Sequence, residues 1–160
     1  MRSRLAHTVI FVTIAPGSLT VAVPAVIVWL TAAHPRGLVV VGVASAVLAI
    51  GLAIFAWCVS DFLTRGIGTP DPSRPPAELV VHGLFALVRN PMYVGVATII
   101  AGEALLFLSP WLLAWDAVVL IAFHLRVIAY EEPTLATVFG AAWQEYRARV
   151  PRWLPRARRR

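Results

Sequence analysis

Four long apolar runs constrain what this chain can fold into more than any other feature. They cover residues 8–30, 38–62, 93–108 and 111–126, and each holds at most two Asp, Glu, Lys or Arg residues. A helix needs about 20 apolar residues to span a bilayer, where only helices and closed barrels satisfy their backbone polar groups. The first two runs reach this length and the last two fall slightly short. The runs predict an all-α integral membrane protein with about four transmembrane helices.

Composition supports this prediction. Apolar residues make up 59% of the 160 residues and charged residues 14%, against about 45–50% and about 25% in soluble domains. The length fits one domain over residues 1–160. The first run exceeds the apolar core of a signal peptide, about 7–15 residues, and is therefore expected to be a retained span. The single cysteine, Cys58, allows no disulfide within one chain, and no His, Cys and carboxylate spacing predicts a metal site.

The arginines predict the topology. All fourteen basic residues are arginines. With four spans, the segments 1–7, 64–91 and 126–160 share one side and contain every arginine except Arg36. The positive-inside rule then places both termini, the loop 64–91 and the C-terminal helical segment 127–160 in the cytoplasm, at the inner membrane if the chain is bacterial. A re-entrant turn at Pro16 or at Ser109-Pro110 would change this orientation. A basic tail could bind nucleic acid, but this composition favours contact with membrane lipids.

A first polar cluster precedes the third apolar run, with the sequence Arg89-Asn90-Pro91-Met92-Tyr93-Val94-Gly95. Pro91 suits the first position of a helix. Arg89 could hold an anion, and Tyr93 could donate a hydrogen bond or stack on a ring. Gly95 leaves room for a flat ligand or another backbone. Taken alone, the cluster is equally compatible with an ordinary helix start and an interfacial arginine.

A second polar cluster follows the last apolar run. Arg126, Tyr130, Glu131 and Glu132 precede Pro133, which is expected to stop the helix. Consecutive helical residues point about 100° apart, so one glutamate could face the bundle while the other faces water. A solvated helix end is the simpler alternative, but carboxylates among aromatic and basic side chains can also hold an ammonium group. We expect the two clusters to meet and form one site.

The motifs in this order resemble the isoprenylcysteine carboxyl methyltransferase family and its relatives, the phospholipid methyltransferases. The family pattern Arg-His-Pro-x-Tyr-x-Gly corresponds to residues 89–95, with Asn90 replacing the histidine. The patterns Glu-Glu, Phe-Gly-x-x-Tyr-x-x-Tyr and Val-Pro-x-x-x-Pro follow. Here these are Glu131-Glu132, Phe139-Gly140-x-x-Trp143-x-x-Tyr146 and Val150-Pro151-Arg152-Trp153-Leu154-Pro155. The loop Gly68-Thr69-Pro70 looks like one in bacterial members. The resemblance covers about residues 66–155.

The resemblance implies an integral membrane methyltransferase that uses S-adenosylmethionine without a Rossmann domain. Its acceptor, a lipophilic small molecule or a lipid-linked substrate, would enter from the bilayer at the cytoplasmic face. By position, the residues carried over to the cofactor pocket are Arg89, Asn90, Pro91, Tyr93, Gly95, Glu131, Glu132 and Tyr146. The catalytic assignments are Arg126, which would orient a carboxylate, and Glu131 or Glu132, which would hold the cofactor amino group or the region of its sulfonium. Asn90 can only hydrogen-bond, so any acid–base role of the family histidine is lost.

Two alternatives remain from the sequence. Glu103 and Asp116 lie at membrane depth, where ionisable groups are often functional; they suit a non-catalytic small transporter or interaction protein. Glu103 could instead pair with His124 or Arg126 across the hairpin. A membrane reductase using NADPH is the other alternative, although no clear extra arginine cluster at the site would hold a 2′-phosphate.

Overall fold

The structure, a computed structural model, describes residues 16–35, 37–65 and 79–155, and every regular element in them is helical. The all-α prediction is confirmed for this part of the chain. Residues 1–15, which include the first eight residues of the first predicted span, lie outside the described residues, as do Arg36, the loop residues 66–78 and the tail 156–160. The elements are η1 (Ser18–Ala22), α2 (Val23–Thr31), α3 (Leu38–Arg65), η2 (Gly83–Ala86), α4 (Pro91–Leu106), α5 (Pro110–Arg126), η3 (Val127–Glu131) and α6 (Glu132–Arg149).

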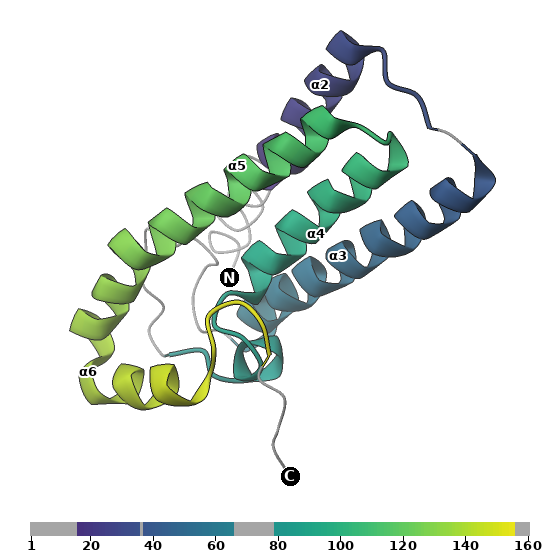
Figure 1. Ribbon diagram of the computed structural model, residues 1–160. Helices are drawn as coiled ribbons and strands as arrows, with labels where there is room; N and C mark the ends of the chain where they lie inside the picture. The colour runs from purple at the N-terminus through teal and green to yellow at the C-terminus, as the bar shows by residue number, and fades with distance from the viewer. Residues whose placement is uncertain (1–15, 36, 66–78, 156–160) are drawn as a thin grey trace.

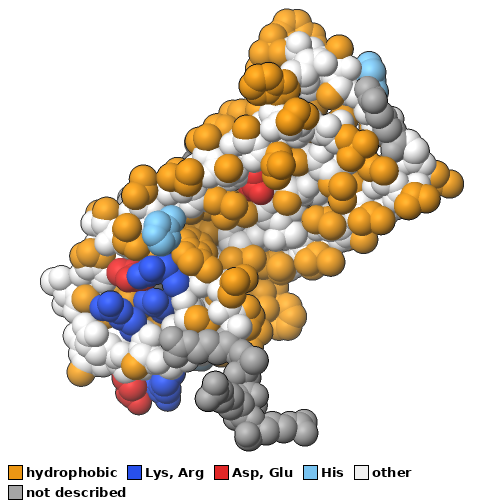
Figure 2. All heavy atoms as spheres, viewed as in Figure 1, with side chains coloured by type: hydrophobic (Ala, Val, Ile, Leu, Met, Phe, Trp, Pro, Cys, Tyr) orange, Lys and Arg blue, Asp and Glu red, His pale blue; other side chains and the backbone are white. Residues whose placement is uncertain are grey.

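Two of the helical stretches are long and apolar enough to cross a membrane. They are Leu38–Asp61 and Pro110–Arg149, while Ser18–Thr31 and Pro91–Leu106 are shorter apolar helices. The helices α3, α4 and α5 run alongside one another, and α6 turns away at one end of this bundle (Figure 1). Hydrophobic side chains cover the visible sides of the bundle, whereas basic side chains gather at one end (Figure 2). The number and orientation of the spans remain predictions.

Glycines set the close packing of α3 against α4. A Cβ added at Gly51 would lie 2.8 Å from the backbone nitrogen of Ile99, and one added at Gly95 would lie 3.0 Å from that of Phe55. Small residues permit such close backbone approach between helices in a membrane. Gly95 therefore serves the second of its two predicted uses, the approach of another backbone.

The helices α4 and α5 form an antiparallel hairpin. Ser109 caps α5 by accepting a hydrogen bond from the backbone N–H of Leu112, and Pro110 follows as the first helical residue. Between the two helices lies a buried core of Val96, Ile100, Val119 and Phe123. At one end of this core the ring of Tyr93 stacks on that of Phe123, with their centroids 4.2 Å apart. The core thus ends at the first polar cluster.

The expectation that Pro133 stops the last helix is wrong. The five-residue π-helix η3 precedes it, the N–H of Glu132 bonds to the carbonyl of Val127, and α6 continues through the proline. The wider π turn relieves the clash between a proline ring and the preceding helical turn. In the same way, the π-helix η1 precedes Pro24, which lies in the first turn of α2.

Candidate functional site

The two polar clusters meet at one end of the bundle, as the sequence predicts. The hydroxyl of Tyr93 donates a hydrogen bond to Oε1 of Glu131. Arg89 pairs with Glu132, with 2.9 Å between Nη1 and Oε1. These two contacts join the start of α4 to the junction between η3 and α6, residues that lie far apart in the chain.

Glu132 is held by two arginines. In addition to Arg89, Arg152 donates from Nε to Oε1 at 2.6 Å and from Nη2 to Oε2 at 2.9 Å. Burial raises the pKa of a carboxyl group, but the hydrogen bonds from Arg152 and the charge of Arg89 outweigh it, so the pKa of Glu132 is lowered. Glu132 therefore carries its negative charge at neutral pH.

Arg89 is the most enclosed cation of the site, with its side chain 9% exposed. Burial lowers the pKa of its guanidinium, against the opposing charge of Glu132. The guanidinium carbon lies 5.5 Å from the ring centre of Trp143. Its buried Nε has no hydrogen-bond partner within the described ranges. Arg89 thus retains one donor that a bound group could use.

Glu131 faces a different set of partners. Besides Tyr93, it accepts a hydrogen bond from Nε of Arg126 at 3.1 Å, and the guanidinium of Arg126 lies 5.5 Å from the ring centre of Tyr130. The side chains of Glu131 and Glu132 are 15% and 12% exposed. The expectation that one of them faces water is therefore wrong, because Arg89 and Arg152 cover the carboxylate of Glu132 and Tyr93 and Arg126 cover that of Glu131.

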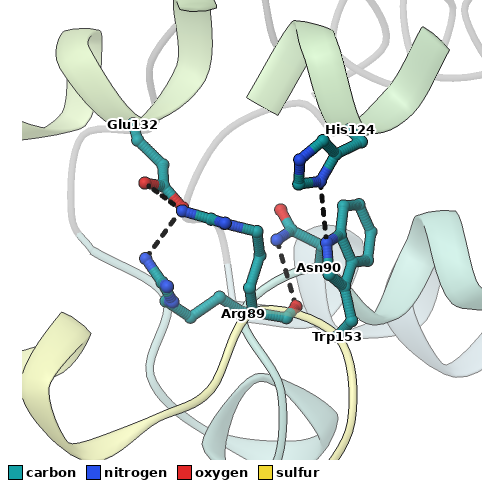
Figure 3. Close-up of polar contacts among 6 residues, drawn as sticks. Arg89, Asn90, His124, Glu132 and Trp153 are labelled. Carbon is teal, nitrogen blue, oxygen red and sulfur yellow. Dashed lines mark hydrogen bonds and ion pairs between the residues drawn. The ribbon is translucent and has the colours of Figure 1, made fainter. Parts of the chain in front are cut away.

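Residues 150–155, here called the strap, close over the first cluster. The N–H of Arg89 donates to the carbonyl of Pro151 at 2.9 Å, and Nδ2 of Asn90 donates to the carbonyl of Arg152 at 3.2 Å. Nε1 of Trp153 donates to Nδ1 of His124 at 3.3 Å. Figure 3 shows the contact of Trp153 with His124 and that of Asn90 with the strap, beside the pair of Arg89 and Glu132.

Sequence reasoning missed three members of this arrangement: Arg152, Trp153 and His124. Arg152 and Trp153 stand inside the Val-Pro-x-x-x-Pro pattern, but nothing in that pattern indicates which side chain turns towards the carboxylates. His124 lies in the last turn of α5, two residues before Arg126. Only its contact with the strap distinguishes it from a histidine at a membrane boundary.

The remaining predicted site residues have structural partners. Pro91 is buried at the first position of α4. Tyr146 is 5% exposed and its hydroxyl donates to the carbonyl of Phe85 at 2.7 Å. The Cβ position of Gly95 faces α3. Roles in cofactor binding stay predictions for all three.

Glu103 and Asp116 take no part in the polar contacts of this site. His124 and Arg126, the partners considered for Glu103, bond instead to Trp153 and Glu131. Oε2 of Glu103 and Oδ1 of Asp116 are buried without a hydrogen-bond partner in the described part of the chain. Among the residues placed in the structure, no group of three or more His, Cys, Asp or Glu could hold a metal ion.

Comparisons with known proteins agree with the arrangement of the motifs. A family model described as phospholipid methyltransferase matches residues 30–142. The chain is 32% identical over 78 residues to a probable protein-S-isoprenylcysteine O-methyltransferase of Oryza sativa subsp. indica, covering 49% of the chain and 41% of the relative. It is 33% identical over 78 residues to protein-S-isoprenylcysteine O-methyltransferase B of Arabidopsis thaliana, covering 49% and 40%.

A fungal relative matches over a similar length. It is the protein-S-isoprenylcysteine O-methyltransferase of Schizosaccharomyces pombe, 36% identical over 80 residues, with 48% of the chain and 33% of the relative covered. The chain thus spans well under half the length of the curated relatives it matches. No solved structure gives a significant match. Because the family model covers most of the chain, including both polar clusters up to Ala142, the chain belongs to the phospholipid methyltransferase family.

Proposed function

We propose that this protein transfers a methyl group from S-adenosylmethionine to a lipophilic acceptor at the cytoplasmic face of a membrane. The observation that carries the proposal is the single site in which the two family clusters meet beside a bundle with apolar outer faces. The named activity of the relatives, protein-S-isoprenylcysteine O-methyltransferase, supports a lipophilic acceptor, either a small molecule or a lipid-linked substrate.

The residues fit the chemical groups of the cofactor. Its amino acid end carries an ammonium and a carboxylate, which suit Glu131 and an arginine respectively. Nε of Arg89 is a buried donor without a partner among the described residues. The rings of Tyr93 and Trp153 pack against the same apolar core and offer surface for stacking of a base. The guanidinium of Arg126, whose side chain is 43% exposed, binds Glu131 through Nε and has further N–H groups that could donate to an anionic group.

S-adenosylmethionine supplies an electrophilic methyl group on a sulfonium. The protein therefore has little acid–base chemistry to perform, and its contribution is alignment of the reacting groups. Glu131 is fixed by Tyr93 and Arg126, so its negative charge is held in one place. The side chains of Arg89, Glu131 and Glu132 are only 9%, 15% and 12% exposed, and low exposure to water strengthens electrostatic contacts.

Calorimetric titration of the detergent-solubilised protein with S-adenosylhomocysteine tests the proposal, with NADPH as the comparison ligand. We expect saturable binding of S-adenosylhomocysteine alone. Glu131→Gln should weaken binding about tenfold or more, the loss of one charged hydrogen bond. Glu145→Gln is the matched control, because Glu145 lies on the exposed surface of α6. Binding of NADPH alone would identify a reductase, and binding of neither by folded protein would contradict both enzyme functions.

A further inference from the structure

We propose that His124 holds the strap in place through Trp153, and that protonation of its imidazole releases this contact. His124 is then a positioning residue whose charge state controls how residues 150–155 close over the first cluster. The contact itself is independent of the proposed function. Its effect on cofactor affinity rests on that function.

The geometry fixes the protonation of His124. The indole nitrogen of Trp153 can only donate a hydrogen bond, and it lies 3.3 Å from Nδ1 of His124. Nδ1 must therefore carry a lone pair, so the imidazole is neutral with its proton on Nε2. In the imidazolium form both ring nitrogens are donors, and the contact with Trp153 is lost.

Release of Trp153 would affect the candidate site because the strap is hydrogen-bonded to residues of that site. Pro151 accepts from the backbone of Arg89, the carbonyl of Arg152 accepts from Asn90, and the Arg152 side chain binds Glu132. Trp153 itself packs against the core of α4 and α5. Of these contacts, the one to His124 is the only one that depends on an imidazole, the side chain that changes charge between about pH 5 and 8.

The groups around this end of α5 are Arg126 and Glu131 on its continuation, Glu132 on α6, Arg89 before α4 and Arg152 in the strap. Three arginines and two glutamates leave one net positive charge. Protonation of His124 adds a positive charge to this group and removes the acceptor of the hydrogen bond from Trp153.

The test follows the indole N–H of Trp153 by nitrogen-15 NMR of the full chain in detergent, with the resonance assigned by its absence in Trp153→Phe. We expect the resonance to move between pH 8 and pH 5.5. In His124→Asn it should stay fixed, because the Asn oxygen can accept the same hydrogen bond and does not titrate. His82→Asn is the control, since His82 lies before η2, and it should titrate as the wild type does. A resonance that stays fixed in the wild type, or that moves equally in His124→Asn, would overturn the proposal.

A second measurement connects the contact to ligand binding. Affinity for S-adenosylhomocysteine should fall several-fold from pH 8 to pH 5.5 in the wild type and remain level in His124→Asn. Affinity in Trp153→Phe should be low at both pH values. Failure of the wild type as well as the variants to bind would count against the proposed function and leave the NMR result to decide the contact. Equal pH dependence in the wild type and His124→Asn would refute a role of His124 in binding.

Discussion

Arg152 binds Glu132 through two parallel hydrogen bonds, at 2.6 Å from Nε to Oε1 and 2.9 Å from Nη2 to Oε2. The contact connects the strap after α6 to the first residue of the same helix. A planar guanidinium matches a carboxylate in this two-bond geometry, whereas an ammonium group does not. The contact therefore depends on arginine in particular as well as on positive charge.

Arg152→Lys should destabilise the protein by about 1.5–3 kcal/mol, the value of a hydrogen bond to a charged group. Thermal unfolding in detergent measures this effect. Arg149→Lys provides the control, because the Arg149–Glu145 pair has side chains 71% and 70% exposed, and such pairs contribute about 0–1 kcal/mol. Equal losses in the two variants would show that the paired geometry at Glu132 has no special role.

The same carboxylate predicts an acid-sensitive contribution to stability. Its pKa is lowered below the ordinary value of 4.5 in the folded protein, so its stabilising contribution is complete above that value. The contribution is lost as the pH falls through the folded-state pKa. The difference in unfolding temperature between wild type and Glu132→Gln should thus be largest above about pH 5 and shrink in more acidic solution. A difference that is constant from pH 7 to pH 3 would argue against a charged Glu132.

Gly95→Ala should destabilise the protein by about 1–3 kcal/mol through overpacking. The added methyl group would lie 3.0 Å from the backbone nitrogen of Phe55 and 3.1 Å from Cγ2 of Ile54. Gly42→Ala adds the same group to the same pair of helices with nothing within 4 Å, so it should be neutral or slightly stabilising. Comparable unfolding temperatures for the two variants would disprove the close contact of α3 with α4.

Gly140→Ala should cost about 1–3 kcal/mol for a different reason, backbone strain. Gly140 has φ 51° and ψ −120° at a kink inside α6, and no atom lies within 4 Å of its Cβ position. Because the kink lies between Glu132 and the strap, the variant should also weaken their contact. The double variant with Arg152→Lys should then lose less stability than the sum of the two single losses.

Much of the fold follows from apolar patterning, because each long apolar run needs a helix to satisfy its backbone. The predicted starts near residues 38, 93 and 111 agree with the structure within two residues. The continuation of the helix beyond residue 126 could not be predicted from apolar patterning. Pro133 normally ends a helix, and only the wider turn of η3 allows it to continue. That adjustment depends on backbone geometry that the side-chain pattern does not contain.

For the site, too, one part could be predicted from the sequence and another could not. Charge and spacing indicated that residues 89–95 would meet Glu131 and Glu132, and they do. Which carboxylate meets which cation could not be derived, because Arg152 is brought to Glu132 by a glycine kink and a strap. Burial of both glutamates likewise depends on side chains from other parts of the chain, Tyr93 at Glu131 and the arginines 89 and 152 at Glu132.

The π-helix η3 has a consequence for chain length. A residue added to or removed from a helix turns everything beyond it by about 100° around the axis. A π turn already holds one residue more than an α turn, so a further residue inserted within 127–130 would swing both glutamates away from their present partners, even with every charged side chain retained. In this protein the pairing of the site is encoded by the number of residues between α5 and Pro133 as much as by their identity.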